Sequence, residues 1–445
     1  MPYIPHSEQD REAMLSAIGL RSIEDLFQDV PASVRFPQLS LPPALSEMEA
    51  RWELETLADA NFTLNDGPSF LGAGAYRHFV PAVVDAVLSR GEFYTAYTPY
   101  QPEISQGTLQ SIFEYQSMIC ALTGMDISNA SHYDGATATA EAVISALNIL
   151  RMKRRKVILS PFVHPEYRAV VRTYTQGMGL QIVGDTSTGP AFPTDLLDTD
   201  TACLIVQYPD FLGRITDLTA VAEAVHAVGA LLVVVTHPIA LGLLKPPGEF
   251  GADIVVGEGQ SMGAGLNFGG PYLGFFATRK KYVRKMAGRL VGQTVDAAGE
   301  RSFVLTLSTR EQHIRREKAT SNICTNQGLV ALAAAVYMAA FGKHGMRRTA
   351  ELCYHRAHYA HRQITRLPGF SALDDTPFFN EFAIRCPRPV DEINAHLLNE
   401  HGIIGGYDLS RDYPHLTNTM LLCVTEMNPQ GEIDMLVEAL QEVTS

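Results

Sequence analysis

The chain has 445 residues, 46% of them hydrophobic and 19% charged, and its formal net charge is −13. This length exceeds what one small core requires, so we expect a large domain and at least one smaller domain. An acidic chain without a basic stripe is not expected to bind nucleic acid.

Neither a membrane span nor a disulfide framework is expected. The first residues include early acids and no apolar core, unlike a secretory signal. The longest apolar run, Gly328 to Gly342, is shorter than the ~20 residues that cross a bilayer and predicts a buried helix. The six cysteines are scattered without a CxxC pair, which is typical of reduced cysteines in a cytoplasmic protein and indicates no metal site.

Residues 1–65 are predicted to form a helical arm. Ser7 is a plausible N-cap with acids in the following turn, and Pro31, Pro37 and Pro42 break the chain into an extended stretch. Such an arm either wraps a partner subunit or packs on its own domain, and the sequence leaves both open. A second loop, 93–107, combines tyrosines with spaced prolines, which predicts a stiff segment that presents aromatic side chains.

Residues 66–330 are predicted to form a large α/β domain. Short apolar runs alternate with helical patterns, which indicates a mostly parallel sheet covered by helices on both faces. Its strands are expected at 157–159, 180–183, 202–206, 231–235, 254–256 and 272–278. Ligands of such sheets bind beyond the carboxyl ends of the strands.

The remaining chain is predicted to contain a helical connection, 331–367, and a small α+β domain, 368–445. Phe382 and Ile384 alternate within an expected strand. The last helix carries an apolar stripe that includes Ile433, Leu436 and Leu440.

The stretch from Gly251 to Pro271 begins as a buried strand and ends in a glycine-rich loop. In many α/β enzymes, a loop of this kind presents a lysine that forms a Schiff base with pyridoxal phosphate. Here Ser261 stands at that place. The acid that would protonate the pyridine nitrogen should end the strand 231–235, where the chain has His237, for which we expect a structural role in capping the strand end.

The third requirement of that cofactor is a set of backbone amides for its phosphate. Gly135, Ala136 and Thr137 open an alanine-rich helix, and amides at such a helix start bind anions. Capping of the helix by Asp134 or Thr137 is the alternative, and the missing lysine favours it. GxSxG, Walker, HExxH and dinucleotide-binding motifs are all absent.

Several long stretches resemble the first subunit of the two-chain P-protein family, glycine dehydrogenase (decarboxylating) of the glycine cleavage system. The matching stretches are 3–6, 70–76, 94–109, 244–253, 267–271, 316–325, 405–407 and 420–426. Members usually have Asp-Pro where this chain has His237-Pro238.

The resemblance implies a fold-type-I pyridoxal phosphate architecture and an α2β2 assembly in which the β chain, subunit 2, carries the lysine and the cofactor. In the implied reaction, glycine loses its carboxylate as CO2 and its aminomethyl group passes to the lipoyl arm of the H-protein. This chain would close the site across the subunit boundary. The residues expected to face it, or to pack in the interface, are Tyr97, Tyr100, Gln101, Glu103, Asn322 and Thr325.

Two other functions remain open at this stage. The chain could be a self-sufficient pyridoxal phosphate lyase or transaminase that uses an unexpected lysine. Alternatively, it could be a binding protein without enzymatic activity.

Overall fold

The computed structural model describes residues 5–443, apart from the side chain of residue 310. Tyr3 and Ile4 of the first matching stretch lie outside this range. The chain divides into two compact units, Met1–Thr63 and Leu64–Ser445. The domain boundaries predicted at 330 and 367 fall inside the second unit and stay predictions.

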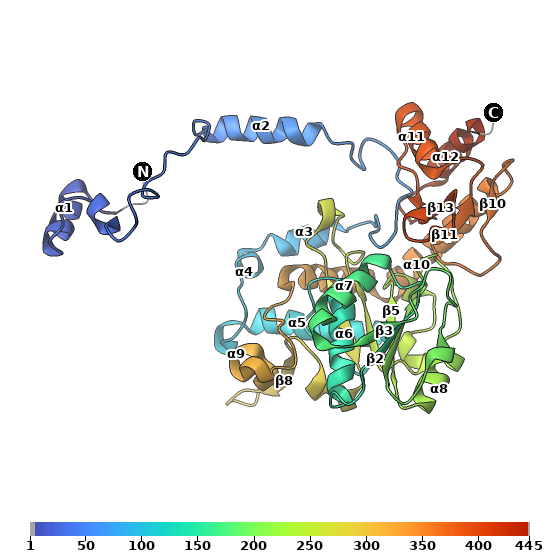
Figure 1. Ribbon diagram of the computed structural model, residues 1–445, viewed down its shortest axis with the longest axis horizontal. Coiled ribbons are helices and arrows are strands. Elements are labelled where there is room, and N and C mark those ends of the chain that lie inside the picture. The colour runs from blue at the N-terminus through green and yellow to red at the C-terminus, as the bar shows by residue number, and fades with distance from the viewer. Residues whose placement is uncertain (1–4, 444–445) are drawn as a thin grey trace. The chain divides into compact units, whose positions relative to one another are not determined.

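The first unit contains α1 (Glu8–Ala17), η1 (Glu24–Phe27) and α2 (Glu47–Asp59) (Figure 1). The Ser7 side chain accepts a hydrogen bond from the Asp10 amide and Asp10 returns one, which confirms the predicted N-cap. Neither α1 nor α2 buries a residue. Trp52 on α2 is 58% exposed, and Leu41 is 72% exposed. These apolar side chains are therefore available to a surface outside the unit.

A seven-stranded sheet forms the centre of the second unit, in the order β1-β7-β6-β5-β4-β2-β3. Strands β2 to β6 pair in parallel, whereas β7 pairs antiparallel with both β6 and β1. The strands are β1 (Ile127–Ser128), β2 (Lys156–Leu159), β3 (Gln181–Val183), β4 (Thr201–Tyr208), β5 (Leu231–Thr236), β6 (Ile254–Glu258) and β7 (Gly274–Thr278). The predicted mostly parallel sheet is confirmed, and its last strand runs against the rest.

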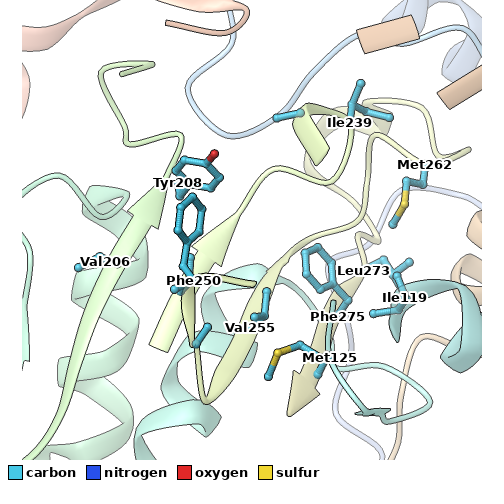
Figure 2. Packing of buried hydrophobic residues seen from close by; sticks show 14 of the residues in the cluster. Ile119, Met125, Val206, Tyr208, Ile239, Phe250, Val255, Met262, Leu273 and Phe275 are labelled. Carbon is cyan, nitrogen blue, oxygen red and sulfur yellow. The ribbon is translucent and has the colours of Figure 1, made fainter. Parts of the chain in front are cut away.

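Both faces of this sheet are buried, because alternate residues of each strand enter different cores. Leu204, Val234 and Phe275 pack in one core, and Ile205 and Val233 pack in the other. In the first core, the rings of Tyr208 and Phe250 meet edge to face with centroids 5.5 Å apart (Figure 2).

Helices cover the two faces. α5 (Gln106–Thr123), α8 (Thr219–Ala227) and α10 (Gly328–Ile364) contribute to the first core, and α6 (Gly135–Ile149) and α7 (Pro165–Thr175) contribute to the second. The remaining helices before the small sheet are α3 (Ala82–Leu88), α4 (Gly91–Tyr94) and α9 (Gln312–Arg315).

α10 is the one helix among the described residues whose length and composition would suit a membrane span. Gly342 has φ +56° and interrupts its helical geometry. Its buried residues enter two cores: Ala334 and Tyr337 pack against the large sheet, whereas Ala357 and Ile364 pack in the core of the small one. The predicted buried helix is therefore confirmed. α10 contributes side chains to both cores as well as connecting the two sheets along the chain.

The small sheet has the order β10-β11-β13-β12 and is antiparallel throughout. It consists of β10 (Ser371–Ala372), β11 (Glu381–Arg385), β12 (Tyr407–Asp408) and β13 (Thr419–Cys423), accompanied by α11 (Val390–His401) and α12 (Gln430–Glu442). Phe382 and Ile384 lie in β11, and Ile433, Leu436 and Leu440 are buried, as predicted.

The hairpin that follows the large sheet in the chain was not predicted. β8 (Val291–Val295) and β9 (Arg301–Leu305) form a hairpin that packs on α5. Two glutamine side chains of α5 attach it: Gln116 bonds both the amide and the carbonyl of Val291, and Gln106 does the same at Phe303. The hairpin thus depends on side chains that lie far away in the sequence.

We expect Leu204→Ala to lower the free energy of unfolding by about 2–5 kcal/mol, because the deletion leaves a cavity beneath β4. Leu204 is fully buried, whereas Leu398 on α11 is 42% exposed and serves as the matched control. Urea unfolding of both variants measures the difference. Equal losses at the two positions would contradict the assigned core.

Candidate functional site

A small cavity lies at the carboxyl ends of β5 and β6, where the parallel sheet is expected to present its ligand site. Its volume is about 30 Å³. It is lined by Gly74, Tyr76, His164, Tyr167, Gln207, Val235, Thr236, His237 and Glu258.

The carboxylate of Glu258, the last residue of β6, lies over the start of α6. Its Oε2 accepts a hydrogen bond from the Gly135 amide at 2.9 Å. Its Oε1 accepts from the amides of Gln260 at 2.9 Å and Leu273 at 2.8 Å. Burial raises the pKa of Glu258 to about 8, and these three amides oppose the shift. The first amide of the helix is therefore bound by a carboxyl oxygen of the chain itself.

The rest of the helix start is capped in the same way. The Thr137 amide donates to Oδ1 of Asp134 at 2.7 Å, and the Asp134 amide donates to Oγ1 of Thr137 at 3.1 Å. This reciprocal pair is a capping box, so the capping alternative of the sequence is confirmed. Of the predicted phosphate loop, Gly135 and Thr137 thus use their amides internally, with Ala136 between them.

Aromatic side chains occupy the space next to this helix start. The Tyr167 hydroxyl lies so close that a Cβ on Gly135 would meet it at 2.3 Å. The His164 ring stacks on Tyr167 with centroids 4.7 Å apart and hydrogen-bonds to the Ala73 carbonyl. A phosphate at this place would have to displace both Glu258 and Tyr167.

The lysine that a pyridoxal phosphate site needs is also missing. Ser261 is 2% exposed and its hydroxyl has no hydrogen-bond partner in the described chain. None of the eight lysines lines the cavity. The residues present at this position therefore do not fit the cofactor.

His237 follows β5, but it does not cap the strand end as expected. Neither ring nitrogen has a hydrogen-bond partner among the described residues. The ring packs edge-on against Tyr76 at 4.4 Å and lies 5.8 Å from the His78 ring. Burial, with a smaller contribution from His78, holds the pKa of His237 well below its usual value. A neutral imidazole cannot keep a pyridine nitrogen protonated, so the acid function is absent as well.

Two of the predicted interface residues, Tyr97 and Thr325, lie at a second place. Together with Asn326 they line a cavity of about 250 Å³ between the tyrosine loop, residues 93–107, and the start of α10. Tyr100 and Thr325 are joined through Arg289, whose Nη2 donates to the Tyr100 hydroxyl and whose Nη1 donates to Oγ1 of Thr325, each at 3.1 Å.

The other three predicted residues stand apart from this cavity. Gln101, Glu103 and Asn322 are exposed and are not among the residues that line it. Arg289 and Asn326 were missed by the sequence analysis. The sequence near Arg289 shows only a basic stretch before it, which comprises Arg279, Lys280, Lys281, Arg284 and Lys285.

Two groups of side chains have ligand atoms within 4.8 Å of one another, although no metal site was predicted: His78, Cys353 and Glu426, and His396, His401 and Glu442. In the first group, Glu426 hydrogen-bonds with His78 at 2.8 Å and with Cys353 at 3.2 Å. Cys324 is exposed, unlike the buried Cys203, Cys353, Cys386 and Cys423, and all six cysteines are free thiols.

The sequence matches the family "Glycine cleavage system P-protein" over residues 1–440. A relative from Thermomicrobium roseum, named "Probable glycine dehydrogenase (decarboxylating) subunit 1", is 58% identical over 100% of both chains. A relative of the same name from Anoxybacillus flavithermus is 53% identical over 98% of both chains. The chain belongs to the P-protein family.

Solved structures confirm the fold-type-I pyridoxal phosphate architecture that the sequence implied. A crystal structure of an inhibitor-bound glycine decarboxylase, a P-protein of the glycine cleavage system, covers 100% of both chains with a TM-score of 0.92 and 46% identity. A sphingosine-1-phosphate lyase from Burkholderia pseudomallei covers 93% of this chain and 94% of its own, with a TM-score of 0.65 and 15% identity, and shows the fold alone.

In this P-protein chain, the segment before α10 is attached along α6. Oε1 of Glu141 accepts a hydrogen bond from the Ser321 hydroxyl at 2.7 Å, and Asn148 donates to the Thr320 carbonyl at 3.3 Å. Glu141 is 2% exposed and its Oε2 has no partner in the described chain. A buried carboxyl therefore anchors the segment that carries Thr325.

We expect Gly135→Ala to destabilise this P-protein chain by about 1–3 kcal/mol, because the new methyl group would overlap the Tyr167 hydroxyl and the Glu258 amide. Gly107 in the first turn of α5 has nothing within 4 Å of an added Cβ. Gly107→Ala should therefore be neutral or stabilising by up to about 1 kcal/mol. Urea unfolding compares the two, and a neutral Gly135→Ala would show that this space is not filled.

We expect Glu141→Gln to gain stability relative to the wild type as the pH rises. Burial raises the pKa of Glu141 from 4.5 to about 7. Between these values the folded carboxyl retains a proton that the unfolded chain releases, so wild-type stability falls through this window. The neutral variant does not lose stability in this way. Its free energy of unfolding relative to the wild type should therefore increase by at most about 2–3 kcal/mol between pH 5 and pH 8.

Denaturant unfolding at a series of pH values measures this difference. Glu223→Gln on the exposed side of α8 is the control, for which no such trend is expected. A Glu141→Gln advantage that stays constant with pH would contradict a buried, protonated Glu141.

Proposed function

We propose that this chain is the α subunit of a two-chain glycine decarboxylase, and that the pyridoxal phosphate and its lysine are on the β subunit. The complex would release the carboxylate of glycine as CO2 and transfer the aminomethyl group to the lipoyl arm of the H-protein. Support comes from relatives named as subunit 1, which align with this chain from end to end.

The observation that carries the proposal is the filled ligand position of the sheet. Glu258 binds the first amide of α6, Ser261 replaces the lysine, and His237 is neutral where an acid is needed. A chain that retains the fold but fills this site with its own side chains requires a second chain for the chemistry.

The role of this chain would then be to bind the partner and to enclose its site. The tyrosine loop presents Tyr94 at 70% and Tyr97 at 84% exposure, and the glycine-rich loop presents Phe268 at 89%. Large exposed aromatic groups are typical of the central contacts of protein interfaces. The arm residues Leu41 and Trp52 offer a further apolar surface for contact with the partner.

We propose an α2β2 assembly in the cytoplasm, with neither a membrane nor a nucleic acid as partner. The net charge of −13 supports the last point. A self-sufficient lyase is the alternative function, and it would need one of the eight lysines to form the Schiff base outside the cavity described above.

Reconstitution tests the proposal. We expect the purified chain with pyridoxal phosphate to show no internal-aldimine absorption that borohydride abolishes, and no release of CO2 from labelled glycine. Adding the lysine-bearing second chain should restore glycine-dependent release. A borohydride-trapped adduct on a lysine of this chain would instead support the self-sufficient enzyme.

The arm provides an independent control of assembly. A chain that lacks residues 1–63 should retain the fold of the second compact unit, because the arm forms a unit of its own. We expect it to lose affinity for the second chain in analytical ultracentrifugation. Association with the second chain at undiminished affinity would contradict the proposal that the arm binds the partner.

A further inference from the structure

Arg289 is a buried cation without an anionic partner. Its side chain belongs to a residue that is 5% exposed, and its three hydrogen-bond acceptors are neutral: Tyr100, Thr325 and, at 3.3 Å, Oδ1 of Asn326. No carboxylate among residues 5–443 forms an ion pair with it. A buried charge is costly unless it is paired, so a site of this kind favours the entry of an anion.

The unused donors lie on one edge of the guanidinium group. Nη1 has two acceptors, Nη2 has only Tyr100, and Nε has none among the described residues. Nε and Nη2 form the edge that binds a carboxylate through two parallel hydrogen bonds. Arg172 of this chain uses the same edge for Asp185, with Nε at 3.3 Å and Nη2 at 2.7 Å from the two carboxylate oxygens.

The route to this edge passes Tyr100. The tyrosine is 52% exposed, its ring centroid is 5.6 Å from the Arg289 guanidinium carbon, and its hydroxyl occupies Nη2. Thr325 and Asn326, the acceptors of Nη1, also line the cavity of about 250 Å³, whereas Arg289 and Tyr100 are not among its lining residues.

We propose that Arg289 binds the carboxylate of a small carboxylate ligand through its Nε–Nη2 edge, with the Tyr100 hydroxyl displaced from Nη2. The ligand class follows from the two-donor edge, and the burial of Arg289, which is 5% exposed, favours a small ligand. The choice of glycine as one probe rests on the proposed function, whereas carboxylate binding does not.

Calorimetric titration of the full chain with sodium acetate tests the site, with sodium chloride at equal ionic strength as the reference. We expect saturable acetate binding in the millimolar range and no saturable binding of chloride, because a spherical ion does not match the two-donor edge. Arg289→Gln should weaken acetate binding at least tenfold. Arg172→Gln, which removes an arginine that is already paired, should leave it unchanged.

Tyr100→Phe is expected to change acetate affinity in the opposite direction. This test remains valid even if the Arg289→Gln variant fails to fold. Loss of the hydroxyl frees Nη2, so acetate should bind about threefold or more tightly. Wild-type acetate binding that is indistinguishable from chloride binding would overturn the proposal, as would Tyr100→Phe binding acetate more weakly than the wild type.

Glycine then serves as the second probe. In the reconstituted complex, Arg289→Gln should raise the KM for glycine at least tenfold with a smaller change in kcat, and acetate should inhibit the wild type competitively. An inactive wild-type mixture would refute the proposed function, while the acetate titration of the single chain would still decide the carboxylate site.

Discussion

The hydrogen bond between the Glu258 carboxylate and the Gly135 amide determines what the central site of this chain can do. It joins the end of β6 to the start of α6, at the edge of the sheet where an anionic ligand would bind. Because Glu258 also binds the amides of Gln260 and Leu273, both oxygens of its carboxyl group are fixed at the site. An external phosphate would have to compete with a group that is covalently part of the chain.

The surrounding side chains are consistent with this constraint. Tyr167 lies over Gly135, the His164 ring stacks on Tyr167, and His237 is held among aromatic rings without a hydrogen-bond partner in the described chain. These side chains pack against one another and against neighbouring residues in the space where a cofactor would bind. The P-protein family thus includes a chain in which the fold is retained and its usual ligand position is filled, so its exposed loops are where a function can remain.

Those loops share a physical character. The tyrosine loop is stiffened by prolines, the segment before α10 is anchored to α6 by Glu141, and both meet at Arg289. Rigid supports of this kind present side chains in fixed positions and lower the entropy lost on binding. The arm is different, since its helices bury no residue of their own and depend on another surface for contact.

The sequence by itself determined the architecture, because runs such as Leu231–Val235 are apolar at every position and suit only a strand buried on both faces. It also predicted Ser261 and His237 at the positions of the lysine and the acid, since these positions follow strands in fixed order. Only the tertiary structure decided how the pocket is filled and where Arg289 lies. Glu258 reaches a helix start 123 residues away, and Arg289 meets Tyr100 189 residues away. The β8–β9 hairpin likewise depends on glutamines of α5. Contacts over such separations depend on the packing of the whole chain, and local periodicity carries no information about them.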